Sequence, residues 1–181
     1  MSQSIYQQHM GARYAELAPE VRAFHALQGS YRLRGEVDVI GAETFLGRVL
    51  SLVMRFPASS PQQAFEFHLR ADNARETWQR RFPSRTMQSS MRLRSRYLVE
   101  SFGPMQCRFI LRADRGILLM EPWGIRWFGL PLPAFILPQI VASERGADGK
   151  LHFDVSARWP GKYLTVAYRG WLDVDSAESL P

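Results

Sequence analysis

The sequence has a single cysteine, Cys107, among its 181 residues. No disulfide can form within the chain, which favours a reducing compartment. The first residues show no basic segment followed by an apolar core, so we expect no signal peptide and a cytoplasmic location. Cys107 itself lies in an apolar segment typical of a strand, where a free thiol packs as a small hydrophobic group.

Lysine is nearly absent, because 21 of the 23 basic residues are arginine. The chain is still basic, with a formal net charge of +6 and an isoelectric point near 10.0. Arginine forks suit phosphate and carboxylate groups and would indicate an anion-binding surface. The alternative is a compositional bias of a GC-rich bacterial genome. The alternating Arg92, Arg94 and Arg96 lack interleaved aromatic residues, so they favour a solvated outer face over a nucleic-acid site.

The known nucleotide and nucleophile motifs are absent. The sequence has no G-x-G-x-x-G, no phosphate-binding loop and no G-x-S-x-G. No histidine pair has the H-x-H or H-E-x-x-H spacing of metal ligands. We therefore expect no metal and no cofactor, and no dinucleotide-dependent activity for this chain alone.

A long uninterrupted hydrophobic run is absent as well. The most apolar stretch, residues 116–141, contains Glu121 and Arg126 and four prolines. Such a segment does not form a membrane-spanning helix. We predict a strand over residues 123–128 and a structured apolar loop over 129–138. This loop would form core, the mouth of a cavity, or a contact with a protein partner or a membrane surface.

The length indicates one domain over residues 1–181. Helical spacing predicts an entry region over residues 4–27, interrupted at Pro19, and a helix over 43–56. Period-two alternation predicts a strand over 31–40, with a bulge at Gly35, and a series of antiparallel strands over 64–174. The last residues, 175–181, are expected to be frayed.

The strand series is clearest over residues 64–112, where turn residues separate four alternating segments. In the first of them, Phe65, Phe67 and Leu69 point to one side and His68 to the other. About nine or ten strands follow two or three helices in the N-terminal third, which predicts an α+β fold. Because long open edges are unfavourable, we expect a curved antiparallel sheet or a β-barrel with the helices packed on it.

Short motifs along the chain, LAPEVRAFH, ETWQRRF, LVESFGP, FGLPLPAFILP and YRGWL, resemble the bacterial family named domain of unknown function 4166. The resemblance covers residues 6–172 and supplies no activity. In that family the domain occurs alone or beside a dehydrogenase-like domain, which implies an interaction module for a dehydrogenase-like partner as one function.

Two strand faces suggest a binding site. Trp78, Arg80 and Phe82 share a face of one strand, and Glu100 and Phe102 share a face of another. If these faces line the interior, an arginine and a glutamate lie among aromatic rings, as in ligand pockets. The alternative is an ion pair that only sets strand register. The predicted pocket residues also include Trp127, Phe128 and Leu132 at the mouth.

These observations favour a binding domain without enzymatic activity, which holds a hydrophobic or lipid-like anionic small molecule in a barrel cavity. Arg80 would contact the anionic head group. The second hypothesis is an enzyme acting on an apolar substrate, with Glu100 or the neighbouring His152 and Asp154 as acid–base groups.

Overall fold

A computed structural model describes residues 3–53, 56–83, 85–159 and 163–181. Part of the helix predicted over residues 43–56 lies outside the described residues. The helices are α1 (Ile5–Met10), η1 (Gly11–Glu16), α2 (Pro19–His25), α3 (Phe45–Val53) and η2 (Ala134–Ile136). The strands are β1 (Gly29–Ile40), β2 (Ser60–Ala71), β3 (Arg75–Arg81), β4 (Thr86–Arg94), β5 (Tyr97–Phe102), β6 (Met105–Asp114), β7 (Ile117–Trp127), β8 (Leu130–Pro131), β9 (Gln139–Ala147), β10 (Lys150–Trp159), β11 (Tyr163–Asp173) and β12 (Glu178–Ser179).

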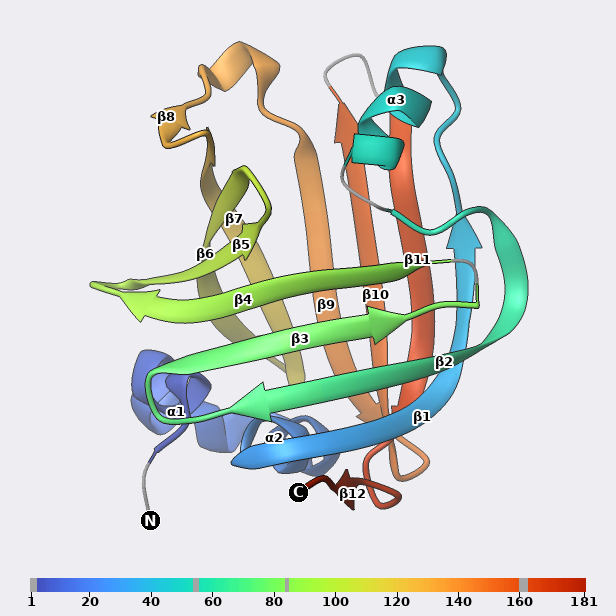
Figure 1. Ribbon diagram of the computed structural model, residues 1–181. Helices are drawn as coiled ribbons and strands as arrows, with labels where there is room; N and C mark the ends of the chain where they lie inside the picture. Colours follow the sequence, from blue (N-terminus) through green and yellow to red (C-terminus); the bar gives the residue numbers. More distant parts are fainter. Residues whose placement is uncertain (1–2, 54–55, 84, 160–162) are drawn as a thin grey trace.

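The strands form a closed antiparallel barrel (Figure 1). Each strand from β1 to β7 pairs with the next, the sheet continues through β9, β10 and β11, and β11 pairs back onto β1. Within the described residues this gives ten barrel strands and two short additions, β8 beside β7 and β12 beside β1. The prediction of an antiparallel barrel is confirmed. The label α+β was loose, because strands dominate and the helices are few and short.

The period-two alternation decides which side chains fill the barrel. Phe65, Phe67 and Leu69 of β2 are each 3% exposed, whereas His68 lies on the outer face, 3.5 Å from Glu66. The same alternation runs along β3, where every second residue is buried. The core is therefore the inner face of the barrel, as the sequence predicted for these strands.

Two strand boundaries differ from the predictions. Four alternating segments were predicted over residues 64–112, but five strands lie there, because one segment is a hairpin of β4 and β5, joined at Ser95 and Arg96. Ser95 has a φ of 56°, so the turn needs the left-handed region but carries neither glycine nor asparagine. The strand predicted over residues 123–128 is the second part of the longer β7, which runs unbroken through Pro122 with a bulge opposite Arg108 and Phe109.

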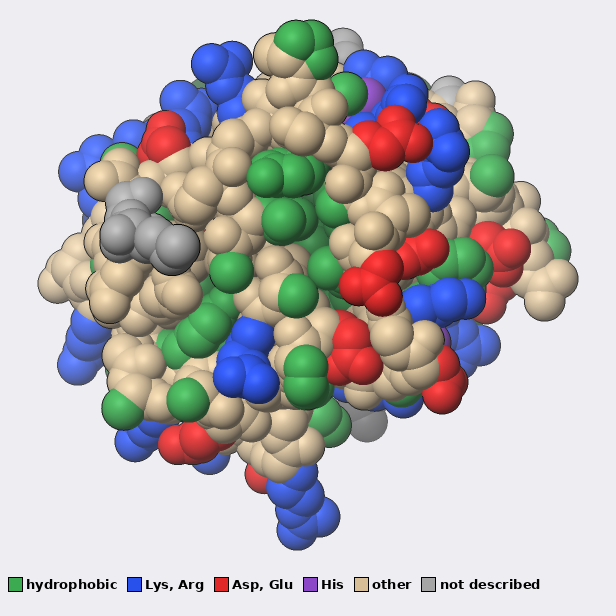
Figure 2. Space-filling model, turned by 90° about the horizontal axis from the view of Figure 1, so that it is seen from below, with side chains coloured by type: hydrophobic (Ala, Val, Ile, Leu, Met, Phe, Trp, Pro, Cys, Tyr) green, Lys and Arg blue, Asp and Glu red, His purple; other side chains and the backbone are tan. Residues whose placement is uncertain are grey.

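The first three helices cover one end of the barrel (Figure 1). Pro19 begins α2 at a position that needs no backbone donor, and Ala18 donates its N–H to the carbonyl of Gly116 at 2.9 Å. Tyr6 and Phe24 are at most 1% exposed and insert into the core. Seen from this closed end, hydrophobic side chains gather in a central area, with acidic side chains together at one side (Figure 2).

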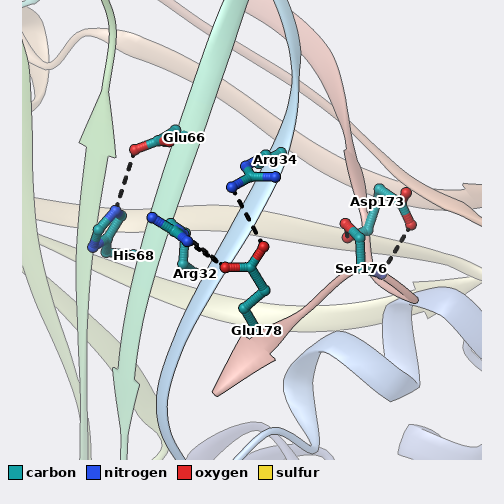
Figure 3. A network of polar contacts seen from close by, with 7 residues as sticks. All are labelled: Arg32, Arg34, Glu66, His68, Asp173, Ser176 and Glu178. Atoms are coloured by element: carbon teal, nitrogen blue, oxygen red, sulfur yellow. Dashed lines mark hydrogen bonds and ion pairs between the residues drawn. The ribbon is translucent and has the colours of Figure 1, made fainter. Parts of the chain in front are cut away.

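The C-terminal residues, predicted to be frayed, instead pair with the edge of β1 as β12. Figure 3 shows Arg32 and Arg34 of β1 pointing to the carboxylate of Glu178, which forms ion pairs with both. A turn in which Asp173 accepts a hydrogen bond from the N–H of Ser176 directs the chain there. The pairs are solvent-exposed and each contributes little to stability, so the backbone pairing also contributes to the position of the tail.

Glycines permit the barrel to close where β1 meets β11. A Cβ added at Gly35 would overlap the backbone carbonyl of Trp171, and one at Gly170 would overlap that of Glu36. Gly35 was predicted to lie at a bulge, but the irregularity of β1 lies between Val37 and Val39. Because Gly35 and Gly170 have no side chain, the backbones of β1 and β11 can approach closely.

We expect Gly35→Ala to lower the free energy of unfolding by about 1–3 kcal/mol, because the added methyl group forces the closing strands apart. Urea denaturation followed by circular dichroism measures the loss. Gly124→Ala is the matched control, since a Cβ at Gly124 of β7 meets nothing within 4 Å and its φ is not positive. Equal stabilities for the two variants would contradict this account of the closure.

Candidate functional site

The barrel encloses a cavity of about 90 Å³ between the β3–β7 wall and the β9–β11 wall. Most of its lining is apolar, and the lining residues are Phe56, Trp78, Arg80, Met87, Met91, Glu100, Phe102, Met105, Cys107, Phe109, Met120, Ile140, Ala142, Ser143, Glu144, Val155, Ala157, Val166 and Tyr168. A smaller cavity of about 40 Å³ borders five of the same residues, including Arg80 and Glu144. The interior is therefore incompletely filled around a few polar side chains.

Arg80 of β3 and Glu100 of β5 form an ion pair at the cavity wall. The guanidinium donates to Glu100 Oε1 at 3.2 Å and to Ser89 Oγ at 3.0 Å, and both charged residues are 5% exposed. The guanidinium carbon also lies 4.9 Å from the ring centroid of Trp78. Both strand faces point into the barrel, which is the condition that the binding-site hypothesis set. The pair satisfies two charges that would otherwise be costly to bury.

A second polar cluster borders the cavity toward the helices. His25 of α2 bonds through Nε2 to Glu144 Oε2 of β9 at 2.6 Å and stacks on Tyr6, with ring centroids 3.6 Å apart. Its Nδ1 is buried, and no partner for it lies among the described residues. The Trp78 indole donates to Glu76 Oε2 at 2.9 Å.

Burial sets the protonation of these groups. Burial raises the pKa of Glu76 to about 7, although His25 and the Trp78 hydrogen bond oppose this shift. Burial also raises the pKa of Glu100, against the opposing effect of the Arg80 guanidinium. The Cys107 thiol has its pKa raised, chiefly by burial, and is unsuited to act as a nucleophile.

The other predicted pocket residues occupy different places. Phe102 lines the main cavity, whereas Phe82 is buried against Phe65, with ring centroids 5.1 Å apart, and lies outside the cavity lining. Phe128 is 75% exposed at the turn after β7. Trp127 is half-buried beside it, and Leu132 is partly buried against the core. The predicted mouth residues therefore lie at the end of the barrel away from α1 and α2 and do not line the cavity.

His152 and Asp154 share one face of β10, as predicted, but this is the outer face. They border a shallow outer hollow together with Arg145, Arg169 and Trp171. The barrel wall separates them from the cavity, so the hypothesis that they act on a molecule inside the barrel is wrong in its geometry. Among the predicted acid–base groups, Glu100 is the one that lines the cavity.

Several interior residues were not predicted as site residues. None of His25, Glu76, Glu144 and Tyr168 was among the predicted pocket or acid–base residues. Alternation along β9 would have placed Glu144 on the inner face with Ile140 and Ala142. The contact of Glu144 with His25, 119 residues earlier, had no signal in the sequence.

Within the described residues, no group of three or more His, Cys, Asp or Glu side chains is arranged to hold a metal ion. In the same part of the chain, no helix is long and apolar enough to cross a membrane.

The buried Glu76 should make the free energy of unfolding depend on pH. The pKa of Glu76 in the folded state, about 7, exceeds the ordinary value of 4.5. The contribution of protonated Glu76 to the free energy of unfolding is therefore fully present below about pH 4.5 and is lost as the pH rises through about 7. The cost of ionisation approaches roughly 3 kcal/mol above that range. Glu76→Gln keeps an acceptor for Trp78. As the pH rises from about 5 to about 8, this variant should become more stable relative to the wild type by about this amount.

Urea midpoints at the two pH values test this expectation, with the exposed Glu16→Gln as control. A stability difference between Glu76→Gln and wild type that does not change with pH would contradict it.

Comparisons with known proteins place the chain in a family. The model of the family "Domain of unknown function (DUF4166)" matches residues 17–172. No curated protein matches. Among solved structures, a protein of unknown function from the DUF3598 family of Nostoc punctiforme PCC 73102 is 14% identical, with a TM-score of 0.44 over 81% of this chain and 46% of its own. This chain therefore spans less than half of that protein.

Two further solved structures are similar at the same level. Rv2717c from M. tuberculosis is 14% identical, with a TM-score of 0.43 over 86% of this chain and 97% of its own. The REP1-NXSQ fatty acid transporter is 12% identical, with a TM-score of 0.36 over 80% of this chain and 92% of its own. The family match extends from α2 at the closed end to β11, the last barrel strand, so the chain belongs to the family of domain of unknown function 4166.

Proposed function

We propose that this protein is a binding domain without enzymatic activity that holds an apolar small molecule inside the barrel. The observation that supports it is the cavity itself, which is mostly apolar and has a few fixed polar groups at its wall. Ligand pockets have this composition, because apolar contacts supply affinity and a small number of polar groups supply orientation.

The cavity limits the size of the ligand. One water requires about 10–15 Å³ of such volume, so about 90 Å³ holds roughly six to nine water-sized groups. This is less than the space of a typical drug-sized site. A short-chain or single-ring molecule fits the cavity as it stands, and a long acyl chain requires the lining to move.

The lining can adapt, because four of the seven methionines of the chain border the cavity, namely Met87, Met91, Met105 and Met120. Methionine side chains have three rotatable bonds and a polarizable sulfur, and they repack around ligands of different shape. We therefore expect modest selectivity for shape and stronger selectivity for the polar group of the ligand.

The polar group would lie near Arg80. We propose that an anionic head group contacts its guanidinium, but Glu100 already pairs with it. An incoming anion therefore competes with a carboxylate whose pKa is raised by burial. Binding becomes favourable when Glu100 takes up a proton, since the guanidinium is then free to pair with the ligand.

A substitution that fills the cavity tests whether it is the binding site. Ala142→Leu adds bulk to the lining and should weaken binding of hexanol at least roughly tenfold in isothermal titration calorimetry, because the added side chain occupies the ligand volume. Ala23→Leu, on the exposed face of α2, is the matched control. Native mass spectrometry of the purified chain supplies the ligand class. If hexanol and other short apolar molecules do not bind, or bind both variants equally, the proposal fails.

The head group is tested through pH. Hexanesulfonate remains anionic, so its affinity should rise as the pH falls from about 8 to about 5, by up to about tenfold per unit, while that of hexanol stays constant. Glu100 faces Arg80, Ser89, Cys107 and Glu144, and among these Glu144 also raises its pKa. Glu100→Gln should remove the pH dependence. The same pH profile for hexanol and hexanesulfonate would contradict a role for the pair.

One observation supports the enzyme hypothesis. Glu144 lines both cavities and accepts a hydrogen bond from His25, so it is a carboxylate positioned to accept a proton from a bound molecule. Chemical change of a co-purified ligand that Glu144→Gln abolishes would favour this hypothesis over simple binding.

A further inference from the structure

Large hydrophobic side chains are exposed at the end of the barrel opposite α1 and α2. Six of them come from two segments at this end, α3 and the β7–β9 connection (Figure 1). This apolar rim consists of Phe45 (82% exposed), Val49 (43%), Leu52 (63%), Phe128 (75%), Leu130 (72%) and Phe135 (79%). Among the described residues, no comparably exposed large hydrophobic side chain belongs to α1, η1 or α2. The exposure is therefore concentrated at one end.

One face of α3 is apolar and exposed. Phe45, Val49 and Leu52 are spaced as one helical face, and all three are exposed. Other positions of the helix contact β11. Gly47 lies near the carbonyl of Leu164, and the Ser51 hydroxyl donates to the carbonyl of Thr165 at 3.2 Å. The helix thus presents an apolar face to the surroundings.

Phe128 occupies its exposed position at a conformational cost. It has a φ of 49° and Gly129 a φ of 81°, in a two-residue turn that joins the paired residues Trp127 and Leu130. Positive φ at both central residues is typical of the type I′ turn, for which asparagine followed by glycine is preferred. An aromatic side chain at positive φ is strained. Five described residues other than glycine have a positive φ, and Phe128 is the one hydrophobic residue among them.

The charge around the rim is positive. Residues 45–53 and 126–139, which form its two segments, contain Arg48 and Arg126 and no acidic residue, and Glu43 precedes the first segment. Glu43 is engaged, since its carboxylate accepts the N–H of Leu164 at 3.1 Å. Arg48 is exposed on α3 beside the apolar face. Apolar side chains flanked by basic ones are the pattern of surfaces that bind anionic membranes.

We propose that the apolar rim docks on an anionic lipid bilayer, with its aromatic and aliphatic side chains entering the headgroup region and the basic residues contacting lipid phosphates. The exposed apolar face of α3 and the strained Phe128 support a surface built for contact, and the positive charge of Arg48 and Arg126 favours an anionic lipid surface over a neutral apolar partner. Docking does not depend on the cavity being a binding site. If the cavity does hold a ligand, Phe56 and Ile140 continue from the two rim segments into its lining.

The test is cosedimentation of the full chain with vesicles. The wild type should bind vesicles of equimolar phosphatidylcholine and phosphatidylglycerol, bind pure phosphatidylcholine at least roughly tenfold more weakly, and lose affinity with added salt. Phe128→Asn should weaken binding roughly tenfold. Because asparagine suits the turn, the same variant should keep or raise the thermal midpoint, so a loss of binding cannot come from unfolding.

Trp123→Ser is the control, since Trp123 is 57% exposed on the barrel wall, where it stacks on Tyr97 with ring centroids 5.8 Å apart. Its vesicle binding should equal that of the wild type. Hexanol binding in the absence of vesicles should be unchanged in Phe128→Asn, which separates failure of docking from failure of the cavity. No sedimentation with anionic vesicles, equal binding by Phe128→Asn, or a wild-type dimer that Phe128→Asn dissociates would each overturn the proposal.

Discussion

The pairing of β1 with β11 is the contact on which the rest of the structure depends, because it turns a sheet into an enclosed interior. It is possible where Gly35 and Gly170 let the two backbones approach. Once the interior is closed, every charge inside it must find its partner there. Arg80 is matched by Glu100, and Glu144 by His25. Burial raises the pKa of Glu76, and the hydrogen bond from the Trp78 indole opposes this shift.

The sequence predicted what depends on local alternation. Phe67 inside and His68 outside follow from a period of two, and so does the shared inner face of Trp78 and Arg80. The hairpin at Ser95 was missed, because its residues carry no usual signal for a left-handed turn. The tail around Glu178 was missed because nothing local reveals that it has a strand edge to pair with.

The polar contacts of the site could not be predicted from local sequence patterns, for a different reason. Which face of a strand points inward can be read from alternation, but which residue lies across the barrel cannot. Arg80 and Glu100 are 20 residues apart on strands that β4 separates, and they could be expected to meet. His25 and Glu144 meet only because α2 covers the closed end beneath β9. His152 and Asp154 showed the same spacing as an inner pair and differ only in the face that they occupy.

The two ends of the barrel differ in how their apolar side chains are used. At one end the helices bury Tyr6 and Phe24 in the core, so the apolar side chains there help to close the barrel. At the other end Phe45 of α3 and Phe128 after β7 are exposed. An apolar side chain that stays in contact with water adds little to the free energy of unfolding. The stability of the barrel therefore does not explain why these positions carry large apolar residues, whereas contact with another surface does.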